Sequence, residues 1–328
     1  MTDAIRIRGL AWKAGRDFAI QDMNLTVPRG AIYGFLGPNG AGKTSTIRLL
    51  LGMAKPYAGS IEVLGHAVPR DAHKALARIG YVPERLHLYP TLTVAESIRF
   101  RRAFYAGFDM AEADRLRRHF GLREHQLVSR LSKGESGKLM MLLALAQRPE
   151  LLVLDEPTDG LDPVLRRELL ASLVEYVHTH GATVFISSHL VHEQERICDW
   201  IGVMDRGRLI AELPMQDFRS GIKRLRVMAA DPGNSASMNG EKTPFAISAS
   251  AADAPFTVLS RERVSERMEA WAVRGWQPSM NEWFTRSAAE VREVLDLDLE
   301  ESFVELLRGA RGDGDGNGHG HNASRETL

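Results

Sequence analysis

The segment Gly37–Thr44 reads Gly-Pro-Asn-Gly-Ala-Gly-Lys-Thr and satisfies the phosphate-loop pattern G-x-x-x-x-G-K-[ST] in full. Its glycines let the backbone curl so that successive N–H groups point inward at a phosphate. Lys43 adds a positive charge for the β- and γ-phosphates, and the Thr44 hydroxyl is placed to bind Mg²⁺. The residues that we predict to bind nucleotide are Gly37, Pro38, Asn39, Gly40, Ala41, Gly42, Lys43, Thr44 and Ser45.

The residues on either side of this loop supply the structural context that the pattern requires. Ala31–Leu36 is apolar and predicts a buried strand, and Ser45–Leu51 predicts a helix. The N-terminus of that helix would face the bound anion, where the helix dipole favours negative charge. A strand, a glycine-rich loop and a helix in this order predict a nucleotide site.

Composition excludes several classes of protein. Lys and Arg together number 42, as do Asp and Glu, so bulk charge gives no argument for nucleic acid or an anionic membrane. The single cysteine, Cys198, excludes an intrachain disulfide framework. Charged residues occupy the N-terminus, and no window approaches the roughly 18 apolar residues of a membrane span. We expect a chain that is soluble by itself, so that any membrane role would come through a partner.

Short strands and helices alternate along the first two thirds of the chain. The N-terminal residues 4–36 predict strands and hairpins, and Leu151–Leu154 is a continuous apolar run typical of a central parallel strand. Between them, Thr93–Arg148 has helical periodicity. The predicted fold class is therefore α/β, a phosphate-loop NTPase core with a mainly parallel sheet, N-terminal antiparallel strands and a helical subdomain inserted at about residues 90–148.

The composition and the hydrophobic pattern of the sequence change beyond about Asp217. We predict a nucleotide-binding domain over residues 1–218, a small α+β appendage over 219–308 and a disordered tail over 309–328, where glycine is frequent. His319 and His321 lie in that tail and are interpreted as part of it, not as a metal site.

Four segments are predicted within or next to the appendage. They are a linker at Asp231–Thr243, a strand at Phe256–Leu259, a helix at Ser265–Val273 and a closing helix at Leu299–Leu307.

A second candidate site element follows the buried strand at Leu151–Leu154. Asp155 and Glu156 stand at its carboxyl end, where open α/β sheets bind their ligands. An aspartate here can hold Mg²⁺ through water, and an adjacent glutamate can polarise an attacking water. Asp155 is therefore a candidate metal ligand and Glu156 a candidate general base.

Three further short motifs occur in a fixed order around this pair. Leu131–Glu135 reads Leu-Ser-Lys-Gly-Glu, Asp159–Asp162 reads Asp-Gly-Leu-Asp, and Ser187–His189 reads Ser-Ser-His. With the phosphate loop and the Asp-Glu-Pro-Thr run, they resemble the ATP-binding-cassette (ABC) ATPase family across roughly residues 4–215. Leu131–Glu135 looks like the family signature, Asp159–Asp162 like its D-loop, and His189 like its switch histidine.

The resemblance implies a mechanism that uses two copies of such a domain. In the family, two domains pair head to tail, and each ATP site joins one chain's phosphate loop to the other's signature. Ser132 and the N–H groups around Gly134 would grip the γ-phosphate across the interface. Glu84 falls where the family usually has Gln and would keep an oxygen for Mg²⁺. The implied catalytic residues are Glu156 and His189, and the implied Mg²⁺ ligands are Thr44, Glu84 and Asp155.

Besides Glu84, this sequence departs from the family pattern at two further places. In the signature, Lys133 and Glu135 replace Gly and Gln, and Ser136-Gly137-Lys138 follows. A lysine suits a phosphate, whereas a glutamate does so only if it points away. The aromatic residue that stacks on adenine in the family would fall near Ala14, with Trp12 and Phe18 as neighbours that we interpret as core residues.

The resemblance also implies partners. One cassette without a membrane span predicts the ATPase subunit of an exporter of the drug and antibiotic type, paired with a second such domain. A separate integral-membrane permease would hold it at the inner face of the cell membrane. The permease would dock between Glu84 and the helices of Thr93–Phe120. The stretch Asp298–Phe303 is similar to an acidic-aromatic stretch near the C-terminus of such cassettes.

Two other functions stay open from the sequence. A soluble ABC ATPase acting on DNA or ribosomes is disfavoured, because only about 87 residues, without sustained heptads, separate the phosphate loop from the signature. The net charge of zero also gives no excess of positive charge that would favour nucleic-acid binding. A regulatory cassette that binds ATP and scarcely hydrolyses it would fit Glu135.

Overall fold

The computed structural model describes residues 3–15, 18–229, 253–265, 267–287 and 289–312. The chain divides into two compact units, Met1–Met215 and Gln216–Leu328, which are described separately. The predicted linker at Asp231–Thr243 and the tail histidines His319 and His321 lie outside the described residues.

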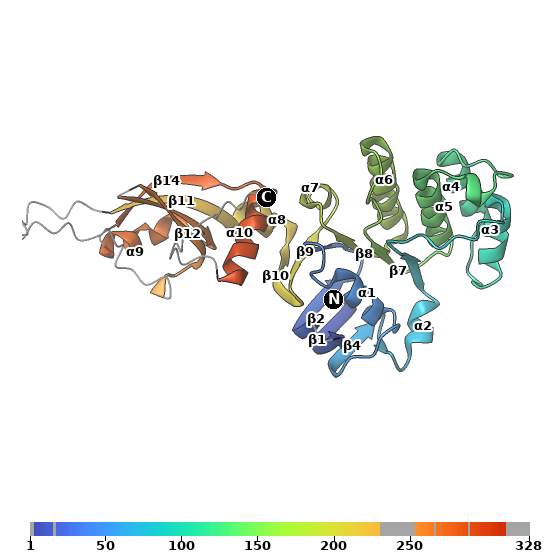
Figure 1. Cartoon of the computed structure of the whole chain (residues 1–328), viewed down its shortest axis with the longest axis horizontal. Coiled ribbons are helices and arrows are strands. Elements are labelled where there is room, and N and C mark those ends of the chain that lie inside the picture. The colour runs from blue at the N-terminus through green and yellow to red at the C-terminus, as the bar shows by residue number, and fades with distance from the viewer. Residues whose placement is uncertain (1–2, 16–17, 230–252, 266, 288, 313–328) are drawn as a thin grey trace, which may run out of the picture. The chain divides into compact units, whose positions relative to one another are not determined.

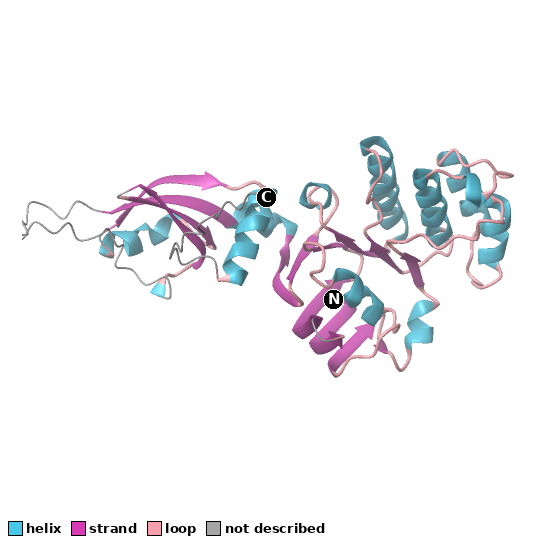
Figure 2. Cartoon of the chain, in the orientation of Figure 1, coloured by secondary structure: helices cyan, strands magenta, loops and turns pink. Residues whose placement is uncertain are grey.

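A six-stranded sheet forms the centre of the first unit (Figures 1 and 2). In spatial order its strands are β10 (Arg208–Pro214), β9 (Trp200–Asp205), β3 (Ile32–Leu36), β8 (Thr183–Ser188), β7 (Leu151–Asp155) and β6 (Ile79–Val82). All neighbours are parallel except β10, which pairs antiparallel with β9. Every residue of β3, β7 and β8 is buried, as the continuous apolar run of β7 predicts. The phosphate loop, the pair Asp155 and Glu156, and His189 lie at the carboxyl ends of these three strands.

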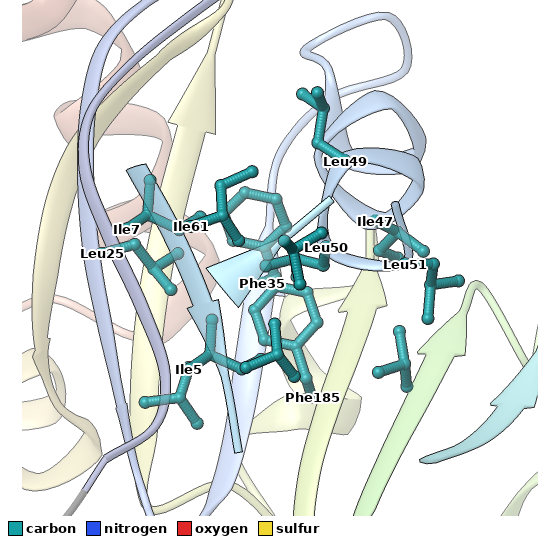
Figure 3. Close-up of a cluster of buried hydrophobic side chains, with 14 of the residues drawn as sticks. Ile5, Ile7, Leu25, Phe35, Ile47, Leu49, Leu50, Leu51, Ile61 and Phe185 are labelled. Carbon is teal, nitrogen blue, oxygen red and sulfur yellow. The ribbon is translucent and has the colours of Figure 1, made fainter. Parts of the chain in front are cut away.

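A second, antiparallel sheet confirms the N-terminal prediction. Its order is β2 (Phe18–Pro28), β1 (Asp3–Ala14), β4 (Ala58–Val63) and β5 (His66–Val68). The main hydrophobic core joins this sheet to α1 (Lys43–Leu50) and to the central sheet. Figure 3 shows that core, with Ile5 and Leu25 from the antiparallel sheet, Ile47 and Leu50 from α1, and Phe185 from β8. This packing fixes α1, and with it the phosphate loop.

Helices build the inserted subdomain that the sequence predicts. They are α3 (Val94–Arg102), α4 (Met110–His119), a 3₁₀ turn at Val128–Arg130 and α5 (Lys133–Leu145). Thr93 and Ser132 each begin a helix with a reciprocal capping box, in which the hydroxyl and a glutamate three residues later satisfy the first free N–H groups. The remaining helices of the unit are α2 (Ala72–Leu76), α6 (Pro163–His180) and α7 (Val191–Gln194). In the part of the chain that the structure describes, no helix has both the length and the apolar character to cross a membrane.

The second unit contains a four-stranded antiparallel sheet. The order is β12 (Thr257–Ser265), β13 (Met268–Arg274), β11 (Ile222–Ala229) and β14 (Ala289–Asp296). Its helices are α9 (Asn281–Arg286) and α10 (Leu299–Arg311), with a 3₁₀ turn at Pro278–Met280, and α8 (Met215–Gly221) leads into β11. An aromatic core of Phe256, Trp271, Trp276 and Phe284 packs on one side of the sheet.

The helix predicted at Ser265–Val273 is wrong, because Met268–Arg274 forms β13 between two other strands. Side chains alternate there, and Trp271 lies opposite Leu225 while Val273 lies opposite Val258. Good helix formers such as Met268 and Ala270 misled the local interpretation, which tertiary pairing overrides. The tail was also placed too early, since α10 continues to Arg311, and residues 313–328 lie outside the described residues.

Candidate nucleotide-binding and hydrolysis site

A cavity of about 490 Å³ opens at the carboxyl end of β3. It is lined by eight of the predicted site residues, together with Ala14 and Phe18. The eight are Asn39, Gly40, Gly42, Lys43, Thr44, Ser45, Glu84 and Glu156. The structure thus gathers residues from the phosphate loop, the segment after β6 and the end of β7 around one space.

Two loop glycines are required by close packing. A Cβ on Gly37 would lie 2.4 Å from the Met204 carbonyl oxygen, and one on Gly42 would lie 2.6 Å from the Phe18 ring. Gly42 also has φ +115°, a conformation that side-chain-bearing residues rarely adopt. Helix α1 begins directly after it, so the first N–H groups of the helix open toward the cavity.

Lys43 is held in place by carbonyl oxygens of its own loop and by Glu156. Its side chain is 6% exposed, and its ammonium donates hydrogen bonds to the carbonyl oxygens of Gly37, at 2.7 Å, and Pro38, at 3.3 Å. It also lies 3.1 Å from Glu156 Oε1. The loop carbonyls therefore orient the cation, and Glu156 balances its charge in a region of low water access.

Glu156 contacts both Lys43 and His189. Its second oxygen, Oε2, accepts a hydrogen bond of 2.9 Å from His189 Nδ1. Its backbone has φ +47°, which is unusual for a residue other than glycine, and its N–H donates to Ser187 Oγ at 3.0 Å. A strained, well-fixed residue between a lysine and a histidine is typical of functional sites.

Asp155 lies buried behind the cavity. It accepts a 2.7 Å hydrogen bond from Ser187 Oγ and another from the Thr44 hydroxyl. Burial raises the pKa of its carboxyl, and these hydrogen bonds offset part of that rise. The charges of Glu84 and Glu156 raise the pKa further, so a cation at this place would relieve the cost of ionising Asp155.

The donor set fits the predicted Mg²⁺. Thr44, Asp155 and Glu84 offer only oxygen atoms, which hard cations prefer, and they come from three segments around one cavity. Among the described residues, no group of three or more His, Cys, Asp or Glu side chains forms a metal cluster. Mg²⁺ in nucleotide sites takes few protein ligands and completes its shell with phosphate oxygens and water.

Ser187 is a site residue to which the sequence assigned no role. It lies directly opposite Asp155 in the parallel pairing of β7 and β8, and its hydroxyl joins the Asp155 side chain to the Glu156 backbone. The signal was present in the sequence, since polar residues at the carboxyl ends of two neighbouring parallel strands meet at one edge of a sheet.

The aromatic neighbours of the cavity divide between two roles. Trp12 and Phe18 both pack against the hydrophobic core, as their interpretation as core residues requires. Phe18 also lines the cavity and touches Gly42, whereas Trp12 does not line it. Ala14 lines the cavity without offering a ring.

The signature residues Ser132 and Gly134 do not line this cavity, because they begin α5 in the helical subdomain. Ser132 Oγ accepts the N–H of Glu135 at 3.1 Å, and Glu135 Oε2 accepts the N–H of Ser132 at 2.8 Å. The Ser132 N–H holds the pKa of Glu135 below its usual range. The unexpected glutamate thus folds back onto its own helix start.

Lys133 and Gly134 contact the segment that resembles the D-loop and the helix after it. The Lys133 ammonium lies 3.7 Å from Asp159 Oδ2. A Cβ on Gly160 would lie 2.2 Å from the same Lys133 nitrogen. A Cβ on Gly134 would lie 2.3 Å from Leu165 of α6, so glycine permits this approach. Within one chain, the signature segment and the D-loop segment are therefore neighbours.

This fold and this site define an ATP-hydrolysing cassette of the ABC class. A sequence profile described as "ABC transporter" matches residues 20–159. The chain is 30% identical over 314 residues to a bacitracin transport ATP-binding protein, BcrA, of Bacillus licheniformis, covering 94% of this chain and 99% of that protein. The chain belongs to the ABC transporter family and is its ATP-binding, ATP-hydrolysing subunit.

Two further comparisons agree. A Nod factor export ATP-binding protein I of Ralstonia nicotianae is 37% identical over 222 residues, covering 64% of this chain and 67% of that protein. A solved structure of an ATP-binding subunit of an ABC transporter superposes with a TM-score of 0.61 at 30% identity, covering 66% of this chain and 92% of that one.

Proposed function

We propose that this chain powers an exporter whose membrane-spanning part is a separate permease, and that it acts at the inner face of the cell membrane through that permease. The names of its relatives support export, since one serves bacitracin transport and another Nod factor export. The observation that carries the proposal is the contact of Lys43, Glu156 and His189 at the mouth of a phosphate loop.

In this proposal, Glu156 is the general base of ATP hydrolysis. Its carboxylate lies between a cation and an imidazole, so both of its oxygens are oriented before substrate enters. Lys43 exchanges part of its contact with the loop carbonyls for the β- and γ-phosphates. His189 keeps Glu156 aimed at the attacking water. Bound Mg²⁺ would neutralise phosphate charge, and Thr44, Asp155 and Glu84 would hold it.

A second copy of the chain, or a related chain, completes each site. Ser132 and Lys133 are exposed at the start of α5, away from the cavity that their own chain forms. A helix start, where the helix dipole favours negative charge, with a nearby lysine is suited to a γ-phosphate presented by another chain. Two ATP molecules would close the pair, and hydrolysis would release it.

The helical subdomain offers a surface for the permease. Tyr89, Phe100 and Phe104 are 58%, 42% and 67% exposed, and their rings pack edge to face with centroids 5.1 and 5.0 Å apart. A hollow of about 550 Å³ lies beside Phe104, between the segment after α3 and α2. Exposed aromatic clusters of this kind mark protein interfaces, and this one lies where we expect a cytoplasmic helix of the permease.

Copurification tests this surface. The tagged chain, expressed from its native operon, should recover an integral-membrane protein, and the double substitution Phe100→Ser and Phe104→Ser should reduce that recovery roughly tenfold. Tyr57→Ser is the matched control, since Tyr57 is 73% exposed on another part of the same unit. ATP binding should be equal in all three proteins.

Other results would redirect the proposal. Recovery of ribosomes or DNA without a membrane protein would favour the soluble ABC ATPase, and it would refute the exporter. ATP binding with negligible turnover, even with the permease present, would favour the regulatory cassette.

A further inference from the structure

A buried carboxylate outside the nucleotide cavity joins the segments that carry the candidate catalytic pair. Glu193 of α7 is 3% exposed. Its Oε2 accepts a 2.7 Å hydrogen bond from the Thr158 hydroxyl, which is itself 3% exposed. Its Oε1 lies 2.6 Å from Arg166 Nη1 in α6. A buried charge is costly unless it is paired, and Glu193 is paired on both oxygens.

The hydrogen bond between Thr158 and Glu193, called the bridge below, lies close in sequence to the candidate catalytic pair Glu156 and His189. Thr158 follows Glu156 by two residues, and Glu193 follows His189 by four. The segment after β7 and the segment after β8 are therefore joined twice, once by His189 and Glu156 and once by Glu193 and Thr158. Two contacts restrain the relative rotation of two segments, whereas one contact would leave it free.

Arg166 extends the bridge to the D-loop segment. Its Nη2 donates to the Leu161 carbonyl oxygen at 3.2 Å, and its Nη1 pairs with Glu193. Leu161 lies within Asp159–Asp162, the segment beside Lys133 of the signature. A displacement of this segment, through Leu161 or through Thr158, therefore reaches α7 and His189 by direct contacts.

We propose that Glu193 is a positioning residue for ATP hydrolysis, which sets His189 and Glu156 relative to each other and links their geometry to the D-loop segment. Glu193 is buried and does not line the nucleotide cavity. It acts by fixing α7 against Thr158 and Arg166, so that a shift of the D-loop changes the aim of Glu156. The inference rests on the proposed function in one respect, the role of Glu156 and His189 as the hydrolytic pair.

Steady-state hydrolysis by the full chain tests this role with small substitutions. Glu193→Gln keeps the shape and removes the charge, and Thr158→Val replaces the hydroxyl with a methyl group. Each should lower kcat about tenfold, because small displacements of catalytic groups strongly lower the rate of the chemical step. KM and the Kd of a fluorescent ATP analogue should stay within about twofold. Thr158→Ser restores the hydroxyl and should restore kcat.

Controls separate positioning from folding. Each variant is assayed well below its own Tm, and Glu175→Gln removes a 58%-exposed carboxylate from α6 as the matched surface control. The double variant Thr158→Val with Glu193→Gln should lose less than the product of the two single losses, because both substitutions act on the one network of Thr158, Glu193 and Arg166.

Three outcomes would overturn the inference. They are an unchanged kcat in Glu193→Gln, equal losses in Thr158→Ser and Thr158→Val, or parallel losses of kcat and nucleotide affinity. Full turnover in Glu156→Gln would instead refute the proposed base, so the two failures are distinguishable.

Discussion

The phosphate loop and the signature segment are both helix starts suited to an anion, yet the chain builds them differently. The phosphate loop precedes a helix that is packed between two sheets, and its Lys43 is 6% exposed and held by carbonyls and Glu156. The signature segment begins α5 with Lys133 62% exposed, and its polar side chains contact their own helix start, Gln126 and the D-loop segment. The phosphate loop, with Asp155 and Glu156, is therefore called the enclosed region, and the exposed signature segment is called the presented region.

This difference teaches which part of the reaction each region serves. Charge stabilisation in a transition state depends on groups fixed beforehand, in a place that excludes water. Recognition between chains needs groups that remain accessible until the partner arrives. The enclosed region should therefore control the rate of the chemical step, and the presented region should control how two sites assemble.

The largest expected effect comes from the enclosed region. Glu156→Gln should lower hydrolysis at least about a hundredfold, because an amide cannot accept the proton of the attacking water. ATP binding should persist, since the loop carbonyls still orient Lys43. Phosphate release measures the first quantity and equilibrium nucleotide titration the second.

The matched control is Glu150→Gln, which removes a carboxylate immediately before β7, at the other end of the strand. That variant should hydrolyse ATP within about twofold of the parent chain. Equal losses of ATP hydrolysis in Glu156→Gln and Glu150→Gln would mean that the loss reflects lower stability of the fold and not the role of Glu156 in catalysis.

Asp155 allows the same region to be tested through stability. Its pKa is raised by burial, so its contribution to stability is fully present below the unfolded pKa and is lost as pH rises through the folded pKa. At neutral pH, Asp155→Asn should therefore raise the Tm of the nucleotide-free chain by about 2 to 4 °C while removing Mg²⁺-dependent hydrolysis. Thermal melts in chelator measure the shift.

The gain in Tm should shrink as pH falls through the folded pKa of Asp155, where the carboxyl of the parent chain becomes neutral. A lower Tm for Asp155→Asn at neutral pH would show that the hydrogen bonds from Ser187 and Thr44 need the charge.

The enclosed region was also the easier one to predict from sequence. Continuous apolar runs and a strict glycine pattern specify β3, β7 and the loop, because burial on both faces leaves few alternatives. Ser187 escaped assignment because its role depends on the pairing of β7 with β8, which no local pattern states. The same limit explains why β13 was mistaken for a helix, since pairing with β11 and β12 decides its state.

Glu135 in the presented region gives the smallest expected effect. Its side chain accepts the Ser132 N–H, and a glutamine can accept it as well, so Glu135→Gln should change hydrolysis by less than about twofold at neutral pH. The depressed pKa of Glu135 stabilises the fold above the unfolded pKa, and that stabilisation is lost as pH falls through the folded pKa. The Tm of Glu135→Gln should therefore depend less on pH than that of the parent chain below about pH 4.5. A many-fold rise in hydrolysis would instead place the Glu135 charge at the γ-phosphate and favour the regulatory cassette, because a capping residue that only completes its own helix has no means to restrain turnover.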